Sequence, residues 1–382
     1  MNKGDLIEFE KEIMDIYQQG RIKAPVHLSG GNEENLIEIF KRINKNDWIF
    51  SNHRNHYHAL LKGMNPELLK QEIIAGNSMH LMNKENKIYT SSIVSGQIPI
   101  ALGTALAIKL KGKKDHVYAF CGDMASEMGI FHECVKYANG HELPITFIVE
   151  DNGISVFTNT SEVWGIRTSQ NLEQKLNPKI IKYNYNRTYP HHGIGLWVDF
   201  ADEKPPKDKE YKNEMKKTMK MLGEDSRTFF LGQTVGCKGS PIYETLSEVP
   251  LEKRIEMPIM EEAQMGISTG MALEGYIPIS IYPRFDFLTL AINQFVNHLD
   301  KTHELSHGEF NPKAIVRVMV GSRYPLDGGI QHTQNHTKAF REFLTNTNVK
   351  ELRHSSEIFE EYKKALDSDK PSLLVEFADL YF

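Results

Sequence analysis

The sequence predicts an α/β protein made of two doubly wound parallel-sheet domains. Three observations predict this fold: a length of 382 residues, short apolar runs that alternate with helical patterns, and one charged, proline-containing break near the middle. A chain of this length exceeds one ordinary core, so two domains of roughly 150–200 residues each are expected. Strands that alternate with helices and carry few polar breaks are typical of a parallel sheet covered on both faces.

The first domain begins with two amphipathic helices and continues, from about residue 93, as alternating helices and strands. The helices are expected from apolar residues at helical spacing, and the strands from short apolar runs. The expected elements are helices over residues 5–19, 32–43, 98–110 and about 127–139, and strands over residues 116–121 and 145–150.

The clearest boundary is the charged stretch 202–226, which contains two adjacent prolines, as linkers often do. Residues 211–222 within it could also form a helix. Beyond the stretch a second α/β pattern begins, with strands expected from residue 228 and over residues 277–282, 314–320 and 372–377. We therefore expect one domain over residues 1–205, a charged linker over 206–226 and a second domain over 227–382.

Composition narrows the class of protein. A net charge of −5 gives no support to a nucleic-acid or membrane partner, and no apolar run approaches the length of a membrane span. The three cysteines lack CxxC spacing, which argues against a disulfide framework or a structural zinc site. The N-terminus shows no signal-peptide pattern. These features predict a soluble, cytoplasmic protein.

Polar side chains stand where two neighbouring strands of the first sheet should end. Gly122-Asp123 follows the first buried strand, and Asn152 follows the next one. In a parallel sheet both ends lie at the same edge, which is where ligands bind in open α/β folds. A carboxylate and a carboxamide offer the hard oxygen ligands that Mg²⁺ prefers, and a helix N-terminus beside them favours an anion. The alternative is ordinary turn chemistry after strands.

The run from Gly122 to Glu133, together with residues 143–153, resembles the thiamine-diphosphate signature. In that family the pattern is Gly-Asp-Gly, a spacer and then Asn-Asn. More specifically, residues 50–160 resemble the α subunit of the decarboxylating component of 2-oxo acid dehydrogenases. The resemblance implies the thiamine-diphosphate-binding fold and a departure at Met124, which replaces the second glycine. It also implies that Mg²⁺ is bound by Asp123, Asn152 and the backbone carbonyl of Ile154. The cofactor would be contacted by Gly122, Ala125 and Ser126.

Residues 52–58 resemble the family's Tyr-Arg-x-His segment, which implies that Arg54 binds diphosphate and that His53 replaces the tyrosine. Arginine suits phosphate because its planar fork donates two parallel hydrogen bonds. The resemblance also places His56 and His80, the latter in Ser78-Met-His-Leu, among the catalytic groups and Val94 against the cofactor. Without the resemblance, the histidines of residues 53–58 could form a solvated polar loop or a metal cluster, and the loop is the favoured alternative.

The second domain should supply the carboxyl group that hydrogen-bonds the cofactor's aminopyrimidine ring. Residues 258–270 resemble the β subunit of the same dehydrogenases, which implies that Glu261, rather than Glu262, occupies the catalytic position. Two glutamates in the first turn of a helix are also favoured by its dipole. Residues 284–294 resemble the segment whose aromatic side chain stacks on the aminopyrimidine, which implies Phe287, although Phe285 and Phe287 could both be core residues of a strand.

Two histidine segments complete the expected site. Residues 329–334 resemble the β subunit's Gln-His-Ser-Gln and imply His332, and residues 189–193 stand where the α subunit carries a His-Gly-His loop. We assign His192 there, with the choice between His191 and His192 open. Histidines beside a carbanion act as acid–base groups or stabilise oxyanions.

The resemblance implies an enzyme that uses thiamine diphosphate and Mg²⁺ on the carbon–carbon bond next to a carbonyl of a small molecule. We expect 2-oxo acid decarboxylation through a hydroxyalkyl intermediate on the cofactor. Transketolase-like ketol transfer and an inert cofactor-binding subunit are the alternatives. We also expect a homodimer with the cofactor at the interface. We expect the family's third, C-terminal domain to be absent, and we therefore do not expect coupling to a lipoyl-carrying acyltransferase.

Overall fold

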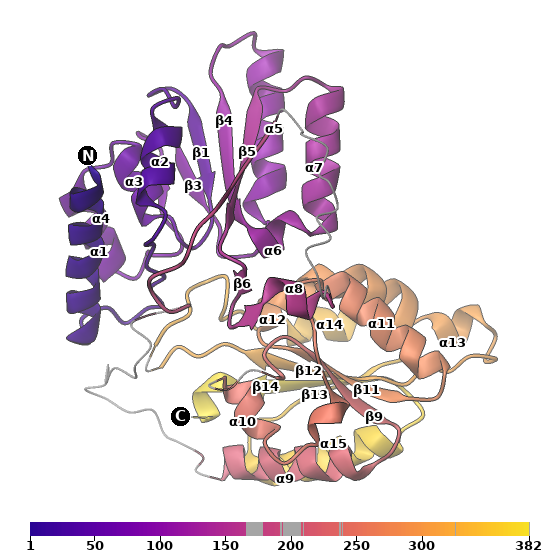
Figure 1. Cartoon of the computed structure of the whole chain (residues 1–382). Coiled ribbons are helices and arrows are strands. Elements are labelled where there is room, and N and C mark those ends of the chain that lie inside the picture. The colour runs from indigo at the N-terminus through magenta and orange to yellow at the C-terminus, as the bar shows by residue number, and fades with distance from the viewer. Residues whose placement is uncertain are drawn as a thin grey trace. The chain divides into compact units, whose positions relative to one another are not determined.

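The computed structural model of the chain divides into two compact units, Met1–Ala201 and Asp202–Phe382 (Figure 1). The structure describes residues 1–165, 179–191, 193, 208, 210–236, 238, 240–324 and 326–381. Each unit is an α/β layer structure with its own six-stranded sheet. The predicted fold class is therefore confirmed, and the two units are described separately below.

The sheet of the N-terminal unit has the strand order β2-β3-β1-β4-β5-β8. Its neighbouring strands are parallel except for the β2–β3 pair, which is antiparallel. A small hairpin, β6–β7, follows β5. The strands are β1 Trp48–Ser51, β2 Met82–Asn83, β3 Ile88–Thr90, β4 Val117–Gly122, β5 Ile145–Asp151, β6 Ile154–Ser155, β7 Thr158–Asn159 and β8 Ile180–Asn184.

Helices cover both faces of this sheet. On one face, Val117, Ala119 and Cys121 of β4 share a core with α5 and α7. On the other face, the ring of Phe120 lies 5.7 Å from that of Phe40 at the end of α2. The helices are α1 Lys3–Gln18, α2 Glu33–Phe40, α3 His56–Leu61, α4 Pro66–Ile74, α5 Gln97–Leu110, α6 Asp123–Ser126, α7 Gly129–Gly140 and α8 Thr160–Val163. The alternation along β4 follows from the two-residue period of a strand buried on both sides.

The sheet of the C-terminal unit has the order β10-β9-β11-β12-β14-β13, and its neighbouring strands are parallel. The strands are β9 Thr228–Gly232, β10 Arg254–Glu256, β11 Ile277–Tyr282, β12 Ile315–Val320, β13 Asn348–Glu351 and β14 Ser372–Phe377. Each residue of β11 and β12 is buried, which agrees with the mostly apolar sequences of both strands.

The helices of the C-terminal unit also lie on both faces of their sheet. One core joins the sheet to α9 and α15, and the other joins it to α12, α14 and the π-helix η3. The helices are α9 Tyr211–Glu224, α10 Pro241–Thr245, α11 Glu261–Leu273, α12 Phe285–Leu288, α13 Thr302–Leu305, α14 Thr337–Phe343 and α15 Ser355–Asp367, with short 3-10 turns at Leu251–Lys253, Thr289–Ala291 and Ala378–Leu380 and η3 at Asn293–Leu299.

One polar network crosses the core between the sheet and α15. Arg317 donates from Nε to Oε1 of Glu376 at 2.7 Å and from Nη2 to Oε2 at 3.0 Å. Tyr362 and Tyr381 donate their hydroxyl protons to the same carboxylate, at 2.7 and 2.5 Å. The four side chains are fully or almost fully buried. A buried ion pair of this kind requires its extra hydrogen bonds, since each charge has left water.

The stretch that composition marks as a linker is mostly helical. Helix α9 occupies Tyr211–Glu224, so the helical alternative for residues 211–222 is correct. Its residues Tyr211, Met215, Met219 and Leu222 are buried in the core of the C-terminal unit. The charged residues within α9 are half-buried or exposed and occupy the other side of this amphipathic helix.

Candidate functional site

The carboxyl edge of the N-terminal sheet brings Asp123 and Asn152 together. Strands β4 and β5 are aligned with Gly122 opposite Glu150, so the residues that follow each strand emerge side by side. The Asp123 carboxylate is only 6% exposed, accepts a hydrogen bond from Thr160 Oγ1 at 2.5 Å, and lies close enough to accept from the Asn152 backbone amide. Burial raises the pKa of Asp123 above its ordinary value, and these hydrogen bonds partly oppose the rise.

Asn152 and Ile154 form a tight turn at the same edge. The Asn152 Oδ1 accepts from the Ile154 backbone amide at 3.0 Å, and its Nδ2 donates to the hydroxyl of Tyr185 at 3.2 Å. Gly153 between them has a φ of +68°, a conformation that favours glycine. The turn chemistry considered as the alternative is therefore present, and it fixes the orientation of the Asn152 amide.

Helix α6 holds the other expected cofactor contacts. Ser126 donates to the carbonyl of Asp123 at 2.7 Å, and Ser95, next to the partly buried Val94, donates to the carbonyl of Ala125 at 3.0 Å. Met124 is buried. A side chain in place of the motif's second glycine is thus accommodated by the core.

The helix expected over residues 127–139 differs from the one observed. Helix α7 begins at Gly129, and the separate four-residue helix α6 directly follows Gly122. The backbone amides next to Asp123 therefore belong to α6 rather than to the first turn of the longer helix. Met128 has an extended backbone and separates the two helices.

Arg54 adds positive charge near this edge. Its guanidinium donates to the carbonyls of Leu28, at 2.9 Å, and His191, at 3.1 Å, which fix its position. Burial, together with the nearby Arg187 guanidinium, lowers the pKa of Arg54 to about 10. Two guanidinium groups close enough to repel each other create a site whose electrostatics favour an anion between them.

In the C-terminal unit, the two adjacent glutamates of α11 have different environments. Glu261 is 4% exposed, and its Oε1 accepts from Gln233 Nε2 at 3.1 Å. Its Oε2 has no hydrogen-bond partner among the residues that the structure describes. Glu262 is exposed and accepts from Asn293. Burial raises the pKa of Glu261, which favours the protonated carboxyl.

The two phenylalanines of α12, Phe285 and Phe287, also differ in burial. Phe285 lies in the core, whereas Phe287 is partly exposed and its ring meets that of His332 edge-on, with ring centres 5.4 Å apart. The two phenylalanines are in a helix, so the alternative that both are core residues of a strand is wrong. Gly321, just beyond β12, lies against the backbone of His332 so closely that a Cβ there would meet the His332 carbonyl oxygen at 1.9 Å.

Comparisons with known proteins identify both units. The family described as dehydrogenase E1 component matches residues 3–173, and the family described as transketolase, pyrimidine binding domain, matches residues 211–381. The N-terminal unit is therefore similar to dehydrogenase E1 components, and the C-terminal unit is similar to the pyrimidine-binding domain of transketolases. Thiamine diphosphate is the cofactor of these families.

Curated relatives are similar to the N-terminal part of the chain. The α subunit of acetoin:2,6-dichlorophenolindophenol oxidoreductase from Cupriavidus necator is 33% identical over 161 residues, which are 40% of this chain and 48% of that protein. The pyruvate dehydrogenase E1 α subunit of Rickettsia typhi is 32% identical over 168 residues, 41% of this chain and 51% of that protein. The chloroplastic α-3 subunit of the pyruvate dehydrogenase E1 component from Arabidopsis thaliana is 32% identical over 178 residues, which are 41% of this chain and 42% of that protein. The chain thus spans about half the length of these relatives.

Two histidines of the N-terminal unit differ in their placement. His56 is fully buried, with Nδ1 3.1 Å from Glu10 Oε1 and Nε2 2.9 Å from Ser78 Oγ. Both of its ring nitrogens are engaged inside the unit, which suits a positioning role, and the catalytic role implied by the resemblance stays a prediction. His80 is half-buried, with Nε2 3.0 Å from Ser92 Oγ.

The loop after β8 was only partly anticipated. His192 lies outside the described residues, whereas His191 is described and its carbonyl binds Arg54. Tyr185 and Arg187, which directly follow β8, were missed. The strand-end rule that found Asp123 and Asn152 could have found them, because β8 pairs in parallel with β5. Among the described residues, no helix has the length and apolarity that crossing a membrane requires.

Proposed function

We propose that this chain is a thiamine-diphosphate-dependent enzyme that acts on the carbon–carbon bond next to a carbonyl, with decarboxylation of a 2-oxo acid as its reaction. The observation that carries the proposal is Glu261, a buried carboxyl with one oxygen bonded to Gln233 and the other without a partner in the described part of its unit. The names of the relatives, which are acetoin and pyruvate dehydrogenase subunits, favour a small oxo substrate.

The N-terminal unit offers groups suited to Mg²⁺ and diphosphate. Asp123, Asn152 and the backbone carbonyl of Ile154 would supply hard oxygen ligands, the type that Mg²⁺ binds together with phosphate oxygens and water. Arg54 and Arg187 would neutralise the diphosphate. The buried state of Asp123 fits this role, since a carboxylate held in low dielectric is stabilised by a bound cation.

When bound, thiamine diphosphate supplies a nucleophilic carbon and an electron sink for the substrate's carbonyl carbon. Glu261 would share a proton with the aminopyrimidine ring, because its raised pKa keeps a proton available at the carboxyl. Phe287 would orient that ring by stacking. His332 and His80 would hold or move protons near the substrate's carbonyl oxygen, as histidines do near neutral pH. Gln233 would fix the rotamer of Glu261.

Exchange of the cofactor's thiazolium proton with deuterated solvent tests the role of Glu261 without knowledge of the substrate. Wild type should accelerate exchange over free cofactor, and Glu261→Gln should slow it by roughly 10²–10⁴-fold, the usual contribution of general acid–base assistance. Glu262→Gln is the matched control and should exchange like wild type, since Glu262 is exposed. If wild type exchanges no faster than free cofactor, the proposed function is wrong. An active preparation can then be screened against 2-oxo acids and, for the transfer alternative, ketose phosphates.

Thermal melts test the metal ligands. Thiamine diphosphate with Mg²⁺ should raise the melting temperature of wild type, because a ligand that binds only the folded state stabilises it by mass action. Asp123→Ala should abolish that rise. If Asp123→Ala bound the cofactor with unchanged affinity, the assignment of Asp123 as a metal ligand would be refuted.

The proposal includes a homodimer, since the resemblance implies that one copy's diphosphate-binding domain works with the pyrimidine-binding domain of another. Closed twofold symmetry is the commonest arrangement of soluble oligomers. Light scattering on the cofactor-loaded protein should give the mass of two chains. A catalytically active monomer would exclude the shared arrangement.

A further inference from the structure

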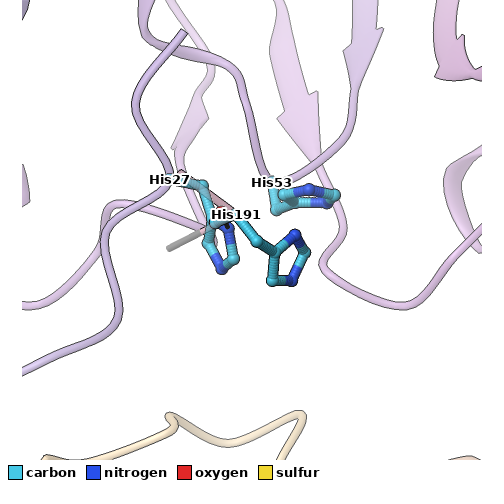
Figure 2. A group of neighbouring side chains, drawn as sticks. All are labelled: His27, His53 and His191. Carbon is cyan, nitrogen blue, oxygen red and sulfur yellow. Dashed lines mark hydrogen bonds between the residues drawn. The ribbon is translucent and has the colours of Figure 1, made fainter. Parts of the chain in front are cut away.

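Three histidines from separate segments gather near the carboxyl edge of the N-terminal sheet. His53 follows β1, His191 follows β8, and His27 precedes α2. One ring nitrogen of each lies within 4.8 Å of a ring nitrogen of each of the others. Figure 2 shows the three imidazoles side by side. Since the carboxyl edge is where α/β sheets bind ligands, the cluster lies where a bound ion would be accessible to a substrate.

The ring spacing suits one shared metal ion. The ring centres are separated by 4.6 Å between His27 and His53, 4.9 Å between His27 and His191, and 5.9 Å between His53 and His191. Three imidazoles that bind zinc tetrahedrally at about 2.0–2.1 Å have their ring centres roughly 5 Å apart and their bonded nitrogens about 3.3 Å apart. The rings are therefore already at the right separation, and small rotations would bring the nitrogens onto a common centre.

His27 is oriented as a metal ligand would be. Its Nδ1 lies 2.6 Å from the carbonyl oxygen of His191, and a carbonyl can only accept, so Nδ1 carries the proton. In the neutral ring the lone pair is then on Nε2. Histidines that bind metals commonly donate their other ring N–H to a backbone carbonyl or a carboxylate, which fixes the tautomer. The side chain is also buried, which limits its freedom.

His191 must make the larger adjustment. Arg54 Nη2 lies 3.1 Å from the His191 carbonyl and 3.4 Å from its Nδ1. The latter contact exceeds the usual 2.7–3.2 Å of an N–H hydrogen bond, so losing it costs little. The guanidinium's own position is fixed by carbonyls. Its charge opposes a dication, so binding depends on the imidazole donors, which suit zinc, cobalt or nickel and not Mg²⁺.

We propose that His27, His53 and His191 bind one divalent transition-metal ion of the zinc or cobalt class. Three protein ligands leave a fourth position for water or an oxygen-bearing small molecule, the arrangement of catalytic rather than structural zinc sites. This site differs from the proposed Mg²⁺ site in its ligand chemistry, nitrogen instead of carboxylate and amide oxygen. It does not depend on the proposed function.

Cobalt titration of the metal-free full-length protein tests this inference. In excess Mg²⁺, Co²⁺ should bind at one ion per chain with the visible absorption of a tetrahedral complex. His53→Ala, at a half-buried position that tolerates truncation, and His27→Ala should each weaken Co²⁺ binding at least 10-fold, the smaller end of the 10–100-fold loss seen for groups that merely support a ligand. His141→Ala removes an exposed histidine and should bind like wild type.

A second measurement keeps the test valid if a variant folds poorly. Zn²⁺ should raise the melting temperature of wild type and leave that of His53→Ala unchanged. Lack of saturable Co²⁺ binding to wild type would overturn the inference and leave three rings in edge-on contact. Displacement of Co²⁺ by Mg²⁺, or equal affinity in wild type and His53→Ala, would overturn it as well, because the ion would then sit on oxygen ligands or on other histidines.

Discussion

Glu261→Gln should stabilise the cofactor-free protein at neutral pH. In wild type the carboxyl is buried, and only one of its oxygens has a partner among the described residues. A buried polar group that lacks a partner costs about 1–3 kcal/mol, and more when it is charged. Glutamine keeps the Oε1 contact with Gln233 and still leaves one group unsatisfied, but it carries no charge.

The gain is the charged part of that penalty, on the order of 1 kcal/mol. For a domain of 150–250 residues this corresponds to a rise of about 2–4 °C in melting temperature. The C-terminal unit, Asp202–Phe382, falls within that size range. Because Glu261 is almost fully buried, solvent screens little of the effect.

The pH dependence has a defined sign. The folded-state pKa of Glu261 is raised above its ordinary 4.5, so the folded protein binds this proton more tightly than the unfolded chain does. The contribution of Glu261 to stability is therefore fully present below about 4.5 and is lost as the pH rises through the folded pKa. The advantage of Glu261→Gln should be largest at pH 7–8 and should shrink as the pH falls toward 5.

Differential scanning calorimetry of wild type, Glu261→Gln and Glu262→Gln at several pH values checks this reasoning. Glu262→Gln should melt within experimental error of wild type. If Glu261→Gln melts at or below wild type at pH 8, or if its advantage grows toward acid, the carboxyl is not a strained buried acid and the argument fails. A confirmed gain would mean that the position is kept for function at a cost in stability.

Other substitutions test the fold around the sites. Arg317→Met should destabilise the C-terminal unit by about 3–5 kcal/mol in chemical denaturation, because it leaves the Glu376 carboxylate buried without its cation; a loss below about 1 kcal/mol would contradict this. Gly321→Ala should lower the melting temperature, since the new Cβ would collide with the His332 backbone. Gly270→Ala, inside α11 with open space around it among the described residues, should instead stabilise by about 0.5–1 kcal/mol, and the opposite order of these two variants would refute the packing argument.

The sequence predicted the elements with the strongest patterns. The expected strand over 277–282 and the expected helix over 98–110 match β11 and α5 closely, because both are long apolar runs. Strand β8 was missed because it is an edge strand of five residues, each half-buried or exposed, so its sequence lacks the apolar run of a buried strand. Helix α9 was treated mainly as a linker because its exposed side dominates the composition.

Site residues were predictable where a strand-end rule or a motif applied. Asp123 and Asn152 followed from consecutive parallel strands, and the preference for Glu261 over Glu262 agrees with their burial. The His27 contribution to the histidine cluster could not be anticipated, since it lies in a segment without periodic pattern and meets its partners only through the tertiary fold. The surroundings of His56 could not be anticipated either, because the sequence does not reveal that a distant carboxylate contacts its ring.

That carboxylate belongs to α1, and it changes how the N-terminal helix should behave in hydrogen exchange. Glu10 is fully buried and accepts from the Ser29 amide, at 3.2 Å, as well as from His56. Opening α1 alone would remove the Glu10 carboxylate from the His56 ring and from the Ser29 amide, which both lie outside α1. Terminal helices usually exchange by local fraying, with free energies near zero. The amides around Glu10 should instead exchange with the protection of β4 and β5, as part of the same cooperative unit that holds Arg54.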